Sequence, residues 1–336
     1  MSWNFERTIK RIKYLSETVP LFNEINLDRY DYDIAIINGE GTMIMTTPER
    51  IDTLMYLLFV YWAKKRGKTV YFVNAMYSDC PKSGRNAHTL SITDKVLRDC
   101  DLVSARDPLS YRYLQQNMTL QNCRYIPDAL FTWYKYVTSG KVDNSRWFAY
   151  FGFETDRNLR GQDLSEGYIC ISGSSRSAWD QKTAKSAYTD LVKAVKSATT
   201  KPILLLQVCS GDNFLQDVAR DTDTLFIPMN TAIILGLNIL AHAEVYISGR
   251  YHPSIMASLG GTYCIFLGAN SHKNIGLQEM LEYAAPSEFG AFPSQEDIRE
   301  ICRILADYLG KDNEFVREKI RSTAQRLAEE AQNLLQ

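Results

Sequence analysis

The sequence lacks long apolar runs, blocks of like charge and the Cys-x-x-Cys spacing of zinc sites. No stretch reaches the roughly 18 apolar residues that a membrane span requires. The N-terminal segment has neither the apolar core nor the small-residue cleavage site of a secretory signal. The seven cysteines are odd in number and mostly lie beside apolar runs, where a free thiol behaves as a small apolar side chain. We therefore expect a cytoplasmic protein that has no disulfide framework and no structural zinc.

A formal net charge of −1 over 336 residues excludes a sequence-wide basic surface, so we expect no nucleic-acid partner. Basic helix faces at residues 5–15 and 314–326 leave two alternatives, peripheral contact with an inner membrane or an ordinary solvated face. The motifs of serine hydrolases, zinc proteases and dinucleotide-binding loops are missing. Aspartates spaced two apart occur only beside strand starts or in loops, which is not a convincing metal site. We expect neither a metal nor another cofactor.

Short apolar runs alternate with helical patterns along most of the chain, which predicts parallel sheets with helical crossovers. The predicted strands are 33–37, 69–75, 102–104 and 124–126 in the first half, and 168–172, 203–207, 224–227, 245–248 and 263–267 in the second. Residues 294–336 follow as one or two long amphipathic helices. The predicted fold class is therefore α/β, with two Rossmann-like doubly wound domains and C-terminal helices.

The alternation breaks between about 138 and 167, where residues that favour turns and solvent accumulate. We place an N-terminal domain at 1–145, a linker at 146–166 and a C-terminal domain at 167–336. Two such domains are expected to bind ligands at the carboxyl ends of their strands.

Three loops of the first half carry candidate chemistry. Glu40 lies between two glycines directly after a predicted strand, where it is either a presented carboxylate or part of an ordinary tight turn. Arg106 follows another strand and is not explained by helix capping, whereas Asp107 is. Asp128 follows the strand 124–126 and is either a site carboxylate or a turn residue. Asn38, Gly39 and Gly41 complete the predicted contacts in this half.

Two loops of the second half carry cations. His252 lies beside Arg250 where a strand meets a helix N-terminus, a place that favours anions. Lys273 occupies the loop after the next strand, where a solvated lysine is the alternative. Polar residues of these loops and of the turn after the strand 168–172 complete the predicted donor contacts: Ser174, Ser254 and Asn270. Carboxylates in one half and cations in the other suit an anionic donor with a phosphate or nucleotide leaving group.

These motifs resemble the polysaccharide pyruvyl transferase family over residues 31–285. They are, in order, DYDIAIINGEGT, VSARDPLS, the turn Ile126-Pro127-Asp128, ISGRYHPSIMA and ANSHKNIGL. The resemblance implies two Rossmann-like domains in a GT-B-like arrangement, with the acceptor on the N-terminal and the donor on the C-terminal domain. It also implies that Arg106, His252 and Lys273 bind phosphoenolpyruvate.

The function implied is transfer of pyruvate from phosphoenolpyruvate, as a ketal, to a sugar of a cell-surface polysaccharide such as an exopolysaccharide, capsule or lipopolysaccharide. The acceptor would be a glycan or a lipid-linked saccharide. Arg106, Arg250 and Lys273 would hold the donor's carboxylate and phosphate, and His252 or Glu40 would move protons.

Two alternatives remain open. His252-Pro253 also resembles the His-Pro element of bacterial sialyltransferases, and a neighbouring branch includes retaining β-Kdo transferases with an essential glutamate and aspartate. In that case the protein is a glycosyltransferase that uses a CMP-activated ulosonic acid, with Glu40 as acid or base and Asp128 as nucleophile or stabiliser. The second alternative is an inactive, sugar-binding relative.

Overall fold

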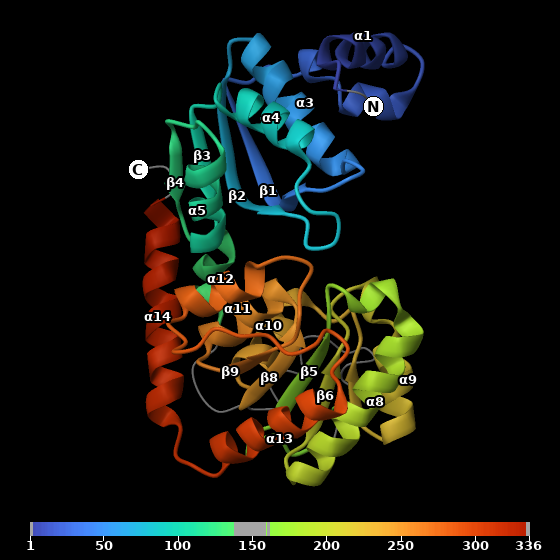
Figure 1. Ribbon diagram of the computed structural model, residues 1–336, viewed down its shortest axis with the longest axis vertical. Helices are drawn as coiled ribbons and strands as arrows, with labels where there is room; N and C mark the ends of the chain where they lie inside the picture. Colours follow the sequence, from blue (N-terminus) through green and yellow to red (C-terminus); the bar gives the residue numbers. More distant parts are fainter. Residues whose placement is uncertain (1–2, 138–158, 160–161, 334–336) are drawn as a thin grey trace. The chain divides into compact units, whose positions relative to one another are not determined.

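The computed structural model describes residues 3–137, 159 and 162–333 (Figure 1). The chain forms two compact units, residues 1–128 (unit 1) and 129–336 (unit 2). Most of the predicted linker at 146–166 lies outside the described residues, so the proposed domain limits remain a prediction. Each unit contains one parallel sheet, which confirms the α/β fold class with two Rossmann-like domains.

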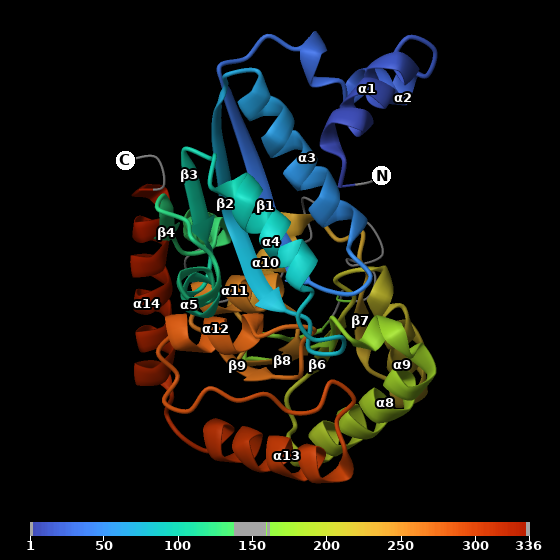
Figure 2. The ribbon, with the colours of Figure 1, turned by 45° about the horizontal axis from the view of Figure 1, so that its top comes forward.

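Unit 1 has the strand order β1-β2-β3-β4, and all neighbours are parallel. Its strands are β1 (Ile34–Met45), β2 (Thr69–Asp79), β3 (Leu102–Ala105) and β4 (Cys123–Tyr125), and its crossover helices are α3 (Ile51–Lys65), α4 (Ala87–Leu97) and α5 (Pro108–Asn117). Because the strand order follows the chain and parallel crossovers are right-handed, these helices share one face of the sheet, as Figure 2 shows for α3 and α4. The described part of this sheet therefore winds in one direction only. On its edge strand β1, Ile34 and Ile36 are 51% and 59% exposed.

Strand β1 does not end at the Gly-Glu-Gly segment, as the sequence predicts, but continues to Met45. The register with β2 shifts between Glu40 and Met43, so the glycines make a bulge within the strand and not a turn after it. Thr42 fixes the bulge: its hydroxyl donates to Gly39 O at 2.5 Å. The prediction was wrong because a bulge and a turn use the same residues.

The N-terminal segment packs on the outside of α3. It forms α1 (Phe5–Leu15), α2 (Pro20–Glu24) and the short 3-10 helix η1 (Leu27–Arg29). Phe5, Ile9 and Ile12 of α1 are buried in the core of unit 1, and Trp62 of α3 donates its indole N–H to Asp28 at 2.9 Å. The apolar stripe of α1 is therefore used inside the protein, whereas its basic face and Tyr14 remain exposed.

Unit 2 has the strand order β7-β6-β5-β8-β9, again with parallel neighbours. The chain moves outward from β5 to β7 and then returns to add β8 and β9 on the other side, which is doubly wound topology. The strands are β5 (Ile169–Ser174), β6 (Ile203–Leu206), β7 (Leu225–Ile227), β8 (Val245–Gly249) and β9 (Tyr263–Phe266).

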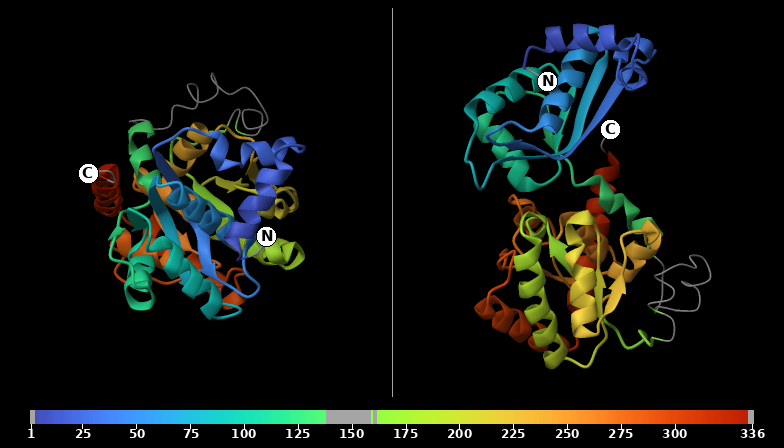
Figure 3. Two further views of the ribbon diagram at one scale, coloured as in Figure 1. Left: turned by 90° about the horizontal axis from the view of Figure 1, so that it is seen from above. Right: turned by 90° about the vertical axis from the view of Figure 1, so that its right-hand side faces the viewer.

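Helices cover both faces of this sheet (Figure 3). Ile169 and Ile171 of β5 face the core formed with α8 (Gln181–Ala198), α9 (Phe214–Thr222) and α13 (Gln295–Leu309). On the other face, Tyr168 donates its hydroxyl to Ile239 O of α10 at 2.6 Å. The remaining helices are α10 (Ile233–Ala241), α11 (Tyr251–Leu259), α12 (Lys273–Met280) and α14 (Glu314–Gln332), with the 3-10 helices η2 (Ala129–Tyr136), η3 (Ser177–Trp179) and η4 (Ser210–Asp212).

Helix α11 begins at Tyr251, directly after Arg250, and Lys273 is the first residue of α12 although the sequence predicts a loop there. Within the described residues, no helix is long and apolar enough to cross a membrane.

The docking of α1 onto α3 is tested by Ile9→Ala. Ile9 is 4% exposed, so truncation should lower the free energy of unfolding by about 2–4 kcal/mol through lost burial and a residual cavity. Tyr14→Ala, on the same helix but 72% exposed, is the control and should change it by less than about 0.5 kcal/mol. Urea denaturation measures both. Equal small effects would mean that α1 is not part of the core.

Candidate functional site

The first candidate cluster lies at the bulge of β1. Glu40 has a φ of 48°, a left-handed conformation that residues other than glycine rarely adopt. Its carboxylate accepts hydrogen bonds from Asn38 Nδ2 at 2.8 Å and from Arg106 Nη1 at 3.1 Å. Gly39 packs so close to β2 that a Cβ there would lie 2.5 Å from Ala75 Cβ. A left-handed backbone conformation like that of Glu40 costs about 1–3 kcal/mol and is found preferentially at functional sites.

Arg106 joins Glu40 to a second carboxylate. Its Nη1 lies 3.2 Å from Asp128 Oδ2, and the side chains of Arg106 and Asp128 are only 2% and 1% exposed, whereas that of Glu40 is 38% exposed. A Cβ at Gly41 would be in ordinary van der Waals contact with this guanidinium, 3.7 Å from Arg106 Nη2. The structure thus brings three predicted residues together. The role of Arg106 as a donor ligand remains a prediction, because its guanidinium lies between two carboxylates.

Asn74 of β2 belongs to the same cluster, although sequence reasoning missed it. It has a φ of 56°, donates from Nδ2 to Asn38 Oδ1 at 3.2 Å, and donates from its backbone N–H to Ser104 Oγ at 3.0 Å. Left-handed residues thus stand at the same level of two neighbouring strands. The available signal was an asparagine that interrupts the apolar run YFVNAM.

Asp107 is the N-cap of α5, as expected: its carboxylate accepts from Ser110 N at 2.8 Å, and Pro108 occupies the first helical position.

The second candidate cluster lies at the carboxyl edge of the unit 2 sheet. Arg250, the residue before α11, is 15% exposed, and its Nη2 lies 2.5 Å from Oδ1 of Asp212, which is fully buried at the end of η4. Burial raises the pKa of the Asp212 carboxyl, and Arg250 opposes that rise. Burial also works to lower the pKa of Arg250, but the carboxylate of Asp212 more than offsets it, so the guanidinium stays charged.

Three more predicted residues lie at this edge. Lys273 Nζ donates to Asn270 Oδ1 at 2.8 Å, and Asn270 N donates to Ser175 Oγ at 2.9 Å. Ser174 donates its hydroxyl to Gly268 O at 2.6 Å. These bonds join the loop after β5 to the loop after β9, so residues about a hundred positions apart form one polar surface.

Two predicted residues lie on α11. His252 is half-buried in the first turn, with its ring centroid 5.3 Å from that of Tyr251. Ser254 is 1% exposed, and its hydroxyl donates to Arg250 O at 2.8 Å. The Ser254 hydroxyl is therefore used within the helix, and its assignment as a donor contact remains a prediction, as does the role of His252.

Besides Asp212, three residues at this edge were not among the predicted site residues. Arg176 lies with its guanidinium carbon 5.5 Å from the ring centroid of Trp179, which is 59% exposed. Burial raises the pKa of the Glu288 carboxyl, while the Ala269 N–H, Asn274, Lys273 and Arg176 act to lower it. Arg176 and Trp179 follow a strand and could have been found from the sequence, whereas Glu288 has no local signal.

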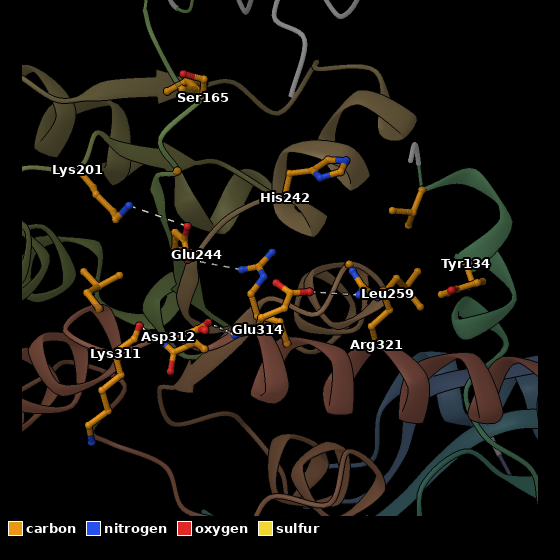
Figure 4. Close-up of a pocket in the computed structure, with 17 residues that line it drawn as sticks. Tyr134, Ser165, Lys201, His242, Glu244, Leu259, Lys311, Asp312, Glu314 and Arg321 are labelled. Carbon is orange, nitrogen blue, oxygen red and sulfur yellow. Dashed lines mark hydrogen bonds and ion pairs between the residues drawn. The ribbon is translucent and has the colours of Figure 1, made fainter. Parts of the chain in front are cut away.

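A pocket of about 870 Å³ lies at the opposite, amino edge of the unit 2 sheet (Figure 4). Its charges are paired: Glu244 lies 3.9 Å from Lys201 and 3.7 Å from Arg317, and Glu314 lies 3.5 Å from Arg321. Ligands of open α/β sheets bind at the carboxyl ends of the strands. The candidate site therefore remains at the other edge, despite the size of this pocket.

The formal charges of the two clusters have opposite sign. In unit 1, Arg106 stands against the two carboxylates of Glu40 and Asp128, which leaves an excess of one negative charge. In unit 2, three cations stand against two carboxylates, an excess of one positive charge; they are Arg176, Arg250 and Lys273 against Asp212 and Glu288. Among the described residues, no group of three or more His, Cys, Asp or Glu side chains could hold a metal ion. The unit 2 cluster is suited to an anion and the unit 1 cluster to proton transfer.

The two α/β units, each with its own parallel sheet, are consistent with the GT-B-like arrangement that the sequence predicts. The model of the polysaccharide pyruvyl transferase family matches residues 2–271, and the chain belongs to that family. Membership makes the protein a transferase. No curated protein sequence matches the chain significantly.

Solved structures of similar fold include UDP-N-acetylglucosamine 2-epimerases. The enzyme from Neisseria meningitidis bound to UDP-GlcNAc is 11% identical, with a TM-score of 0.59 over 100% of this chain and 82% of that one. The MnaA–UDP complex from S. aureus is 10% identical, with a TM-score of 0.57 over 98% and 80%. The Methanocaldococcus jannaschii enzyme with UDP-GlcNAc and UDP is 12% identical, with a TM-score of 0.55 over 98% and 81%. At such low identity the likeness shows the fold alone.

The buried charge cluster of unit 1 is tested by Arg106→Met. The substitution leaves Asp128 buried without its cation, so the free energy of unfolding should fall by about 3–5 kcal/mol. Arg98→Met is the control: Arg98 is 53% exposed and pairs with Asp94 on the surface, so its loss should cost less than about 1 kcal/mol. Chemical denaturation measures both variants. A small effect at Arg106, equal to the control, would contradict the buried pairing.

Proposed function

We propose that this protein transfers pyruvate from phosphoenolpyruvate to a sugar of a cell-surface glycan, forming a ketal. The observation that carries the proposal is the cationic excess at the carboxyl edge of unit 2, where Arg250 follows β8 and Lys273 begins the helix after the neighbouring strand β9. Phosphoenolpyruvate carries a carboxylate and a phosphate on one small carbon frame, and two separated cations suit such a donor. Family membership supports the same reaction.

The reaction needs side chains that transfer protons and a site that binds the anionic donor. The methylene carbon of the donor takes a proton, and the bond between C2 and the phosphate oxygen breaks with its electron pair on the phosphate. Two sugar hydroxyls form the two C–O bonds of the ketal. Their two protons balance the one added to the methylene carbon and the one carried away by phosphate. Cations around the leaving phosphate stabilise the charge that develops on it.

The proposed roles follow from the geometry of each residue. Arg250 and Lys273 bind the carboxylate and the phosphate, and Asn270 orients the lysine through its 2.8 Å hydrogen bond. His252 and Glu40 are the two candidates for proton transfer, since His252 is half-buried in the first turn of α11 and Glu40 is partly exposed in the bulge. A glycan or lipid-linked saccharide supplies the hydroxyls.

One observation favours a second function, transfer of an ulosonic acid from a CMP-activated donor. Glu40 and Asp128 both form ion pairs with the guanidinium of Arg106. Paired carboxylates are the residues that retaining sugar transfer uses as acid and nucleophile. In this reading the unit 2 cluster would bind the CMP phosphate and the donor carboxylate. The two functions share the anion site and differ in whether a nucleotide is recognised.

The donor is identified by thermal-shift titration of the wild-type protein with phosphoenolpyruvate, CMP and CDP. Phosphoenolpyruvate should raise the melting temperature in a concentration-dependent way because a ligand that binds only the folded state stabilises it. Stabilisation by CMP alone would replace the pyruvyl proposal by ulosonate transfer. If none of the three binds, neither transfer function is supported, and the alternative is an inactive, sugar-binding relative.

The anion role of Lys273 is tested by Lys273→Met. Loss of one of two cations should raise the KM for phosphoenolpyruvate by about ten- to a hundredfold, the effect expected for a charge-assisted hydrogen bond to the donor. Lys311→Met is the matched control, since Lys311 is 63% exposed and lies at the amino edge of the sheet. Steady-state assays of phosphate release measure both. An unchanged KM in the Lys273 variant would remove this residue from the donor site.

A further inference from the structure

Asp212 is the fully buried member of the unit 2 cluster. Its Oδ1 lies 2.5 Å from Arg250 Nη2. The hydroxyl of Ser177 lies 3.4 Å from the same oxygen, and Val208 donates its backbone N–H to Oδ2 at 3.3 Å. Three different loops therefore hold this carboxylate, and its position is fixed before any ligand arrives.

Two glycines leave room for the ion pair. A Cβ on Gly173 would lie 2.0 Å from Asp212 Oδ1, and a Cβ on Gly211 would lie 3.2 Å from Arg250 Nη2 and 2.8 Å from Ala178 Cβ. Any side chain at Gly173 would displace the carboxylate. The loops after β5 and β6 are thus shaped around the pair of Asp212 and Arg250.

The pair does not occupy every donor of the guanidinium. Arg250 Nε makes no hydrogen bond among the residues that the structure describes, and the side chain keeps 15% of its surface exposed. A guanidinium has five N–H donors in a fixed plane, so one carboxylate on one side fixes that plane and leaves donors for an anion. The same carboxylate repels that anion.

We propose that Asp212 is the positioning residue of Arg250: it fixes the plane of the guanidinium and weakens its hold on phosphate. The inference rests on the proposed role of the unit 2 cluster as the anion site. A fixed guanidinium favours the correctly oriented donor, and the nearby negative charge lets the phosphate product leave. Asp212 touches neither donor nor product in this scheme and acts only through Arg250.

The test is calorimetric titration of inorganic phosphate into Asp212→Asn. Removal of the carboxylate charge leaves Arg250 uncompensated, so phosphate should bind about tenfold more tightly than to the wild type. Asp217→Asn is the matched control, because it removes the same charge from a surface pair with Arg220 that is 46% exposed at the aspartate. The control should bind phosphate as the wild type does. In Asp212→Asn combined with Arg250→Gln the gain should disappear.

A second readout separates positioning from a merely structural role. In steady-state assays with phosphoenolpyruvate, Asp212→Asn should lower kcat about tenfold and lower the inhibition constant of phosphate, since the guanidinium is charged but no longer fixed. A purely structural aspartate would reduce activity without tightening phosphate binding.

Each outcome of the phosphate titration either supports or overturns the proposed role of Asp212. Unchanged or weaker phosphate binding by folded Asp212→Asn overturns it. Should that variant fail to fold, Asp212→Ser removes the carboxylate and keeps a hydroxyl for Arg250, and loss of folding there as well would make Asp212 structural. The phosphate titration does not depend on the identity of the donor, whereas the wild-type titration with phosphoenolpyruvate tests the proposed function. The two failures are therefore distinguishable.

Discussion

A guanidinium that is withdrawn from water must lie against a carboxylate, and both units contain such a group. In unit 1, Arg106 lies between Asp128 and Glu40; in unit 2, Arg250 lies against Asp212. In unit 1 the ion pairs join the bulge inside β1 to the segments after β3 and β4, and in unit 2 the ion pair joins the segment after β6 to the one after β8. The bulge of β1 and the loops after β5 and β6 can be understood as the backbone that these ion pairs require.

Stability alone does not explain these pairs. Breaking a buried ion pair is costly, but replacing both partners by apolar groups of similar volume is often neutral or favourable by about 1–4 kcal/mol. The interiors of both units already contain large apolar clusters that would accept such groups. The backbone strain at Glu40 adds a further cost at the same place. Charges and strain that the fold does not need are best explained by what they do for a ligand.

The strands and most helices could be predicted because their signals are local. Apolar runs such as 203–206 and 245–249 stand between polar turns, and each became a buried parallel strand. The end of β1 could not be predicted, because Gly39 and Gly41 are as typical of a turn as of a bulge. What decides between them is the fit of Gly39 against Ala75 of the neighbouring strand, and that is a tertiary contact.

The candidate site was only half predictable for the same reason. In unit 2, sequence reasoning found Arg250 and Lys273, because a cation that follows a strand is visible, but not the carboxylates Asp212 and Glu288 that compensate them. Asp212 lies 38 residues from Arg250, and in the sequence it resembles an ordinary loop residue. Without it, the cations add up to a strongly positive site; with Asp212 and Glu288, the excess is a single charge. Under the proposed function, a site with that small excess would bind the anionic donor and still release the phosphate, which a turnover requires and a strongly cationic site would prevent.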